Sequence, residues 1–300
     1  MKTFLILFKR NVKMFFKDKG LFFTSLITPL ILLVLYATFL SNVYSDSFEA
    51  IFKGMGVVLP EKVVSAATGG QLLSSLLAVS CITVSFCSNM LMVQDKVSGA
   101  RKDLLISPVK KSTLALSYYF ATTLSTLIVC FVAAAAGFIY IALTGWYMSF
   151  IDVLLILADV VILVTFGTAL SSVINHFLST QGQISAVGSI VSSCYGFICG
   201  AYMPLSSFSE GLRNVLMFLP GTYGTSLVRN HTLNGVVAEM EAINLPQQAI
   251  EGFKTSVDCN LSFFGTAVST GAMCLIMLGT VLLLIGGYVL INVVSNNKNK

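Results

Sequence analysis

Long apolar stretches are the feature of this sequence that most constrains its fold. Each has about 20 residues or more, the length at which an α-helix crosses the hydrocarbon core of a bilayer. Each is apolar on every side, whereas the strands of a membrane β-barrel alternate apolar and polar residues. The sequence therefore predicts an all-α integral membrane protein with six transmembrane helices, at residues 21–42, 69–93, 112–143, 151–174, 182–203 and 262–294.

Composition agrees with a lipid environment rather than an aqueous one. Hydrophobic residues make up 56% and charged residues 10% of the 300-residue chain, whereas roughly 25% of the residues in soluble domains are charged. The net charge of +5 comes from Lys and Arg near the ends of the predicted spans, so it does not indicate a nucleic-acid partner. The seven cysteines are scattered and the two histidines are isolated, so we expect neither a disulfide framework nor a metal site. We expect one transmembrane domain, 1–300.

The first 20 residues have the pattern of an amphipathic helix that lies on the membrane surface. On a helical wheel, aromatic and aliphatic side chains gather on one side and Lys and Arg on the other. Such a helix places its apolar side in the headgroup region and its basic side toward anionic lipid. The alternative is a basic flank that only sets the orientation. The residues that define the predicted interfacial helix are Lys9, Arg10, Lys13, Phe15 and Phe16.

The distribution of basic residues predicts the orientation. Most of the 18 Lys and Arg residues lie in the N-terminal segment, in the loop after the second predicted span, or at the C-terminus. Cytoplasmic loops are enriched in Lys and Arg. We therefore expect a multi-pass protein of the bacterial plasma membrane with both termini in the cytoplasm. An even number of spans agrees with termini on the same side.

A long outer segment, 204–261, separates the last two predicted spans. Pro204 and Pro220 interrupt its apolar beginning, which predicts one or two short re-entrant helices in the outer leaflet. Its polar continuation, 229–261, predicts a small extracellular cap. The preceding span, 182–203, is rich in Gly and Ser, and we expect it to pack against protein more than against lipid.

The short loop between the second and third predicted spans says most about function. Residues 94–108 are highly charged, and Asp95–Ile106 is predicted to form a helix of about three turns that Pro108 terminates. A rigid helix that joins two spans on the cytoplasmic side is a suitable docking surface. A charged loop that only maintains topology is the alternative.

This loop resembles that of the type-2 ABC transporter permeases. The family has a charged start, a Gly, a Leu pair, and then Ser or Thr before Pro. The sequence departs from the family at Val97, where an acid is usual, and at Ala100, where Thr is usual. The resemblance extends to the amphipathic start, the six-span arrangement and the interrupted outer segment, and so to nearly the whole chain. With Arg101, the matching residues form the predicted ATPase-coupling set: Asp95, Lys96, Gly99, Arg101, Leu104, Leu105, Ser107 and Pro108.

The resemblance implies that the chain is the permease subunit of an ATP-driven exporter. Such a subunit pairs with a second permease subunit, identical or different, and with cytoplasmic ATPase subunits. The sequence has no G-x-x-x-x-G-K-[ST] phosphate loop, so we expect no enzymatic activity in this chain, no cofactor bound by it, and ATP and Mg²⁺ on the partner ATPase. The long outer segment favours a drug, peptide or lipid as the substrate over a polysaccharide.

Asp159 is the main candidate for a residue in the translocation path. It lies in the middle of the predicted span 151–174, where an ionised side chain costs at least a few kcal/mol unless it faces protein or water. It is predicted to contact substrate or a proton. The alternatives are a hydrogen bond to a hydroxyl group of the span 182–203 and a contact across a dimer interface.

Two other functions are open. The first is a proton-coupled secondary transporter with Asp159 as the carrier, which predicts inverted repeats and further intramembrane charges that the sequence does not show. The second is a non-transporting membrane protein, such as an immunity or scaffold protein, which would not depend on an ATPase.

Overall fold

The computed structural model describes residues 2–54, 56–107 and 109–294, and nearly all of them are helical, which confirms the predicted all-α class. The first half contains α1 (Lys2–Lys17), α2 (Lys19–Leu35), a π-helical segment (Tyr36–Leu40), α3 (Ser41–Gly54), α4 (Glu61–Val97), α5 (Ala100–Ile106) and α6 (Lys111–Thr144). The second half contains α7 (Phe150–Phe177), α8 (Gln181–Ile198), a 3-10 turn (Leu205–Ser207), α9 (Glu210–Leu216), α10 (Pro220–Ala242), α11 (Gln247–Ser256), β1 (Leu261–Phe263), β2 (Thr266–Val268) and α12 (Thr270–Val294).

Among the described residues, five helical stretches are long and apolar enough to cross a membrane. They are Lys19–Gly54, Glu61–Val97, Lys111–Thr144, Phe150–Phe177 and Thr270–Val293. The predicted fifth span forms α8, but two Gln residues and several Ser residues make this helix less apolar than the others. The total of six spans therefore stays a prediction.

Several element boundaries differ from the prediction. The first long helix continues to Gly54 and α4 starts at Glu61, so the predicted outer segment between them shrinks to residues 55–60. The last long helix starts at Thr270 rather than at 262, because β1 and β2 pair as an antiparallel hairpin before it. Phe264 and Gly265 form the hairpin turn with φ values of 46° and 84°, which suits a two-residue turn with Gly second.

α4 is the central helix of the bundle. Of its most apolar stretch 94% is buried, and it packs against α2, α6, α7, α8 and α10. A Cβ atom at Gly70 would meet Leu233 of α10, and one at Gly167 of α7 would meet Ile82, so these glycines allow the close approach of neighbouring helices.

The prediction that 182–203 faces mainly protein is wrong for α8 in the single chain. Only Ile184 and Gly196 of α8 are buried, while Ser185, Ser189 and Ser193 are exposed. Small residues indicate that helices can approach closely, but they occur in both α4 and α8. The position of each helix in the bundle decides which one is covered.

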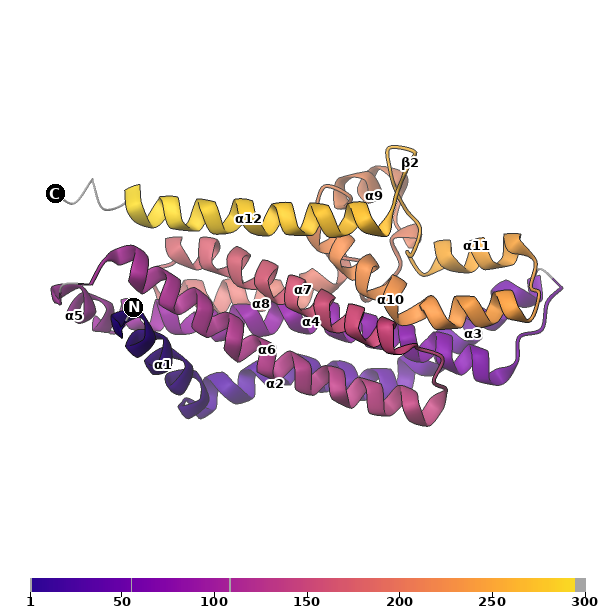
Figure 1. Cartoon of the computed structure of the whole chain (residues 1–300), viewed down its shortest axis with the longest axis horizontal. Helices are drawn as coiled ribbons and strands as arrows, with labels where there is room; N and C mark the ends of the chain where they lie inside the picture. The colour runs from indigo at the N-terminus through magenta and orange to yellow at the C-terminus, as the bar shows by residue number, and fades with distance from the viewer. Residues whose placement is uncertain (1, 55, 108, 295–300) are drawn as a thin grey trace.

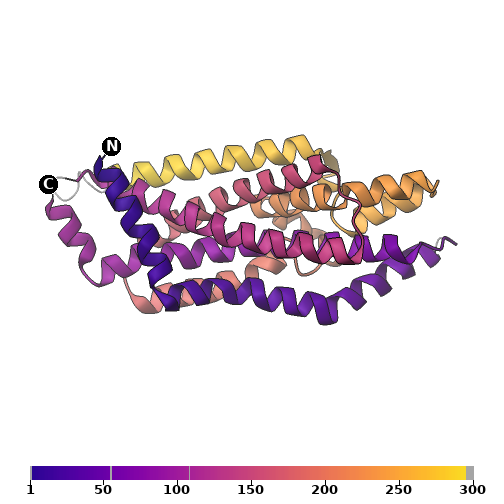
Figure 2. The same cartoon turned by 60° about the horizontal axis from the view of Figure 1, so that its bottom comes forward.

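The two ends of the bundle are built from different elements. The start of α1, α5 and the C-terminal end of α12 lie at one end, which we call the α5 end (Figure 1). The tip of α3, α11 and the connection between α3 and α4 lie at the opposite end, the α3 end (Figure 1). α1 runs obliquely across the α5 end, while the long helices follow the long axis (Figure 2). The elements predicted to be cytoplasmic thus share one end.

Residues 204–261 pack directly on the bundle, including 229–261, the predicted extracellular cap. α10 packs against α4, α7 and α12, and its second half joins α3, α11 and the start of α4 in one apolar cluster that includes Phe48, Phe52, Leu233 and Phe253. The 3-10 turn and α9 are short, as predicted for the start of this segment. The cap is therefore continuous with the bundle, because α3 and α4 extend beyond the predicted spans.

Candidate functional site

The predicted coupling helix is divided at Gly99. This residue has φ 85° and separates α4 from α5, so the single helix predicted over Asp95–Ile106 is wrong. A left-handed φ is readily adopted only by Gly. α4 therefore carries Asp95 and Lys96 on its last turn, and α5 is a separate short helix beyond the bundle.

Asp95 points into the protein rather than toward a partner. Its residue is 3% exposed, and its carboxylate accepts hydrogen bonds from both terminal nitrogens of Arg10 on α1 and from the Tyr118 hydroxyl on α6. The distance from Arg10 Nη2 to Asp95 Oδ1 is 2.9 Å, and the hydrogen bonds that the guanidinium donates to Asp95 raise the pKa of Arg10. Beside it, Asn11 donates to Ser117 at 3.3 Å. These contacts, which we call the Asp95 clamp, join α1, α4 and α6.

Lys96 also points inward. Its Nζ donates to the carbonyl oxygens of His176 and Leu178 at 2.8 and 2.6 Å, at the C-terminal end of α7. A cation at this position satisfies carbonyls that have no partner within the helix and is attracted by the negative end of the helix dipole. Lys96 thus ties the end of α4 to the end of α7.

The exposed surface of α5 differs from the predicted coupling set. Leu104 and Leu105 pack on the apolar cluster around Leu91 and Tyr118, and Arg101 is half-buried. Pro108 lies outside the described residues. Ser107 is exposed, as predicted, and the prediction missed three more exposed residues of α5: Lys102, Asp103 and Ile106, the last with 84% of its surface exposed. Arg101, Leu104 and Leu105 have the i, i+3, i+4 spacing of a single helix face. This spacing was the available signal that the other residues of α5 face outward.

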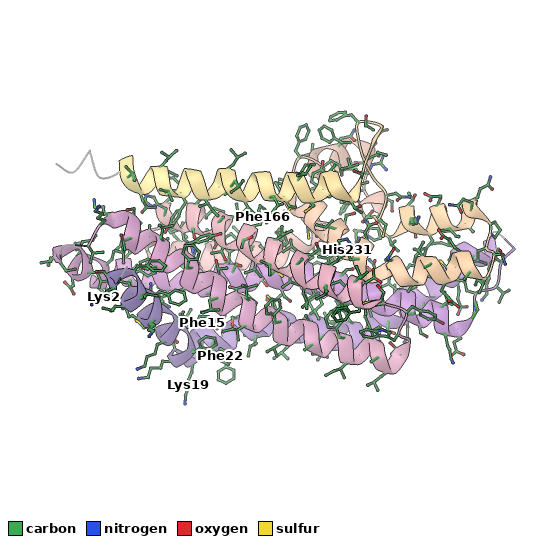
Figure 3. The ribbon with its side chains drawn as sticks, in the orientation of Figure 1. Lys2, Phe15, Lys19, Phe22, Phe166 and His231 are labelled. Carbon is green, nitrogen blue, oxygen red and sulfur yellow. The ribbon has the colours of Figure 1, made fainter. Side chains whose placement is uncertain are left out.

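The interfacial helix is only partly arranged as predicted. Lys9, Lys13 and Phe16 are exposed. Arg10 is engaged in the Asp95 clamp, and Phe15 is 2% exposed because α1 packs on α6 through Leu7, Asn11 and Phe15. The Phe15 and Phe22 rings meet where α1 joins α2, with centroids 6.2 Å apart (Figure 3). The helix ends at Lys17 and the side chain of Asp18 caps α2, so the turn between α1 and α2 lies at Asp18.

Asp159 faces α10 rather than α8. Its Oδ2 lies 2.6 Å from Nδ1 of His231, which α10 carries (Figure 3), and its side chain is 5% exposed. Two turns earlier on α7, Asp152 accepts a hydrogen bond of 2.8 Å from Asn234 of α10. Neither predicted alternative partner, a hydroxyl group of α8 or a partner subunit, is needed to satisfy Asp159. A role in translocation stays a prediction.

Arg229 of α10 is fully buried. Its guanidinium donates to the carbonyl oxygens of Gly200 and Val257 at 3.0 and 2.9 Å, and it forms an ion pair of 3.3 Å with Asp258. Burial raises the pKa of the Asp258 carboxyl, and the attraction of Arg229 opposes this. Arg229 thus joins α10 to the turn after α8 and to the segment before β1. No sequence pattern marks this contact, because its partners, two backbone carbonyls and the side chains of Ser74, Ser75 and Asp258, lie far from Arg229 in the chain.

A groove runs between α2 and α8. Its volume is about 570 Å³, and it is lined mainly by apolar residues of α2 together with Ser192, Ser193, Phe197 and Tyr202. Among the described residues, no group of three or more His, Cys, Asp or Glu side chains is placed to hold a metal.

The family model described as ABC-2 type transporter matches residues 2–232, which include the Asp95 clamp, α5 and the groove. No curated protein matches the sequence. The match covers more than half of the chain, and five helices of the described residues are suited to cross a membrane. The chain therefore belongs to the ABC-2 type transporter family and is an ABC permease, the membrane component of such a transporter.

Proposed function

We propose that this permease works as an ATP-driven exporter and that a separate ATPase subunit docks on α5. The observation that carries the proposal is the way α5 is mounted. Its outer surface exposes Lys102, Asp103 and Ile106, and the α4 turn from which it extends is held to α1 and α6 by Asp95 and to α7 by Lys96. A force on α5 would reach four helices at once.

Ile106 provides the test of docking. An apolar side chain with 84% of its surface exposed, next to charged residues, has the character of an anchor that a partner covers. Ile106→Asp should remove the ATPase from the affinity-purified complex and abolish nucleotide hydrolysis in the preparation. Val58→Asp is the matched control, because Val58 is 83% exposed and lies in the connection between α3 and α4, at the α3 end.

Three outcomes oppose the proposed function. If Ile106→Asp retains the ATPase as well as the wild type does, α5 is not its docking site. If the wild-type chain transports with no nucleotide hydrolysed, the ATP-driven function fails and a proton-coupled transporter takes its place. A chain that neither transports nor binds an ATPase would be a non-transporting scaffold or immunity protein.

We further propose that two permease subunits pair across the face of α2 and α8 and enclose the groove between them. Exposed Ser185, Ser189 and Ser193 allow close approach of a partner helix. The enclosed groove is mainly apolar and carries hydroxyl groups from Thr28, Tyr36, Ser192, Ser193 and Tyr202, which suits an amphipathic drug, peptide or lipid.

Cysteine cross-linking tests the pairing. Cys194 lies on the exposed face of α8, while Cys274 of α12 is half-buried. Mild oxidation of the protein in membranes should give a disulfide-linked dimer that Cys194→Ser removes and Cys274→Ser does not. A dimer that persists in Cys194→Ser, or no dimer in the wild type, would place the interface elsewhere.

A further inference from the structure

A basic pocket lies at the α5 end, between the ends of α4, α5, α6, α7 and α12. It consists of two adjoining cavities of about 370 and 480 Å³ that share Leu105, Lys111 and Asn292. Five cationic side chains line the two cavities: Lys96, Arg101, Lys102, Lys110 and Lys111. No Asp or Glu lines either cavity.

The positive charge of the basic pocket is not neutralised within the described part of the chain. Lys96 is bound to two carbonyl oxygens of the α7 end, and none of the other four cations is among the ion pairs of the described residues. The positive end of the α6 dipole adds to the same field, because α6 starts at Lys111 and its N-cap residue makes no side-chain capping bond. Converging cations in a concave, partly apolar site attract and concentrate anions.

The apolar part of the lining indicates the kind of anion. Leu105, Val109 and Val293 lie beside the cations, and α12 continues from the pocket with exposed Leu290, Leu283 and Leu282. A free inorganic anion would gain nothing from these side chains. An anionic headgroup attached to acyl chains would use both parts, with the chains along α12. Basic pockets between transmembrane helices are suited to anionic lipid headgroups.

We propose that the basic pocket binds the phosphate-bearing headgroup of an anionic phospholipid, with Arg101, Lys110 and Lys111 as its main contacts. The lipid links α5, α6 and α12 at the end of the bundle where α1 lies. Binding of the headgroup does not depend on the substrate or on the direction of transport.

The test uses the purified full-length chain in lipid nanodiscs and in native mass spectrometry. Phosphatidylglycerol should remain bound to the wild type in preference to phosphatidylcholine. Lys110→Gln/Lys111→Gln should weaken this binding about 30-fold, since each of the two basic residues contributes about 1 kcal/mol near an anionic surface and about 1.4 kcal/mol corresponds to a factor of ten. Lys110→Arg/Lys111→Arg should retain it. Lys9→Gln/Lys13→Gln is the matched control, because it also removes two positive charges, from exposed lysines of α1, the helix that crosses the α5 end.

Each outcome decides the proposal. Equal losses in the Lys9/Lys13 and Lys110/Lys111 variants would show a diffuse surface attraction and refute a defined pocket. Binding of soluble glycerol phosphate as tight as that of phosphatidylglycerol would refute a contribution of the acyl chains and favour a free phosphate compound as the ligand. Equal retention of phosphatidylcholine would refute the role of charge. A monodisperse elution profile for the glutamine variants shows that lost binding is not lost folding.

Discussion

The Asp95 clamp should contribute a measurable part of the stability of the α5 end. Asp95→Asn preserves the shape of the side chain but removes its charge and faces an amide group toward donors from Arg10 and Tyr118. Removing one partner of a buried ion pair costs about 3–5 kcal/mol. The side chain of Arg10 is 27% exposed and can be partly rehydrated, so we expect a loss of about 3 kcal/mol, at the lower end. Tyr118→Phe removes one hydrogen bond to a charged acceptor and should cost about 1.5 kcal/mol.

A double-mutant cycle isolates the interaction. Free energies of unfolding would be measured for Asp95→Asn, Arg10→Met and the double variant in mixed micelles of SDS and a non-ionic detergent. Contacting residues of one network show coupling energies of about 0.5–3 kcal/mol, and we expect the upper half of this range. The local consequence is a loosened α1, so a cysteine placed at Leu7, which is 5% exposed in the wild type, should react faster with maleimide in Asp95→Asn. Additive single-variant effects together with unchanged labelling at position 7 would refute the argument.

Three further predictions concern α10. Arg229→Gln should lower the free energy of unfolding by about 3–5 kcal/mol, measured in the same mixed micelles, because it leaves a buried carboxylate unpaired; a loss below about 1 kcal/mol would contradict this. Gly235→Ala should cost about 1–3 kcal/mol, since its Cβ would overlap a backbone carbonyl of the α6–α7 connection, whereas Gly271→Ala, with open space around it, should be neutral. Asp159→Ala and His231→Ala should each cost about 1–3 kcal/mol in the same titration, and the double variant should lose less than their sum. Unchanged transport and unchanged stability in Asp159→Ala would contradict both a stabilising Asp159–His231 pair and a role of Asp159 in translocation.

The predictions that depend on local sequence agree with the structure. The all-helical class and the bounds of α6 and α7 to within a few residues follow from the length and hydropathy of each stretch, because a helix in lipid satisfies its backbone hydrogen bonds within its own segment. The basic helix at the start likewise follows from a local pattern. Where helices extend beyond the apolar stretch, as α3 and the start of α4 do, the sequence was less informative.

In the candidate site, the sequence did not predict which partners the charged side chains contact. The sequence identified 94–108 as the important loop, but it assigned Asp95 and Lys96 to the surface that meets a partner. Their carboxylate and ammonium groups have the same chemistry whether they face a partner or a neighbouring helix, and only the packing of α1, α6 and α7 around the end of α4 decides between the two.

By itself, the sequence determined that the chain is a helical membrane protein with a charged loop between two of its long helices. The tertiary structure decided which helix is central, that Arg229 is buried, and that Asp159 meets His231. The physical reason is the range of the interactions. Hydropathy acts within one segment of about 20 residues, whereas Asp159 and His231 are 72 residues apart, Asp95 and Arg10 are 85 residues apart, and their partners are chosen only when the helices pack.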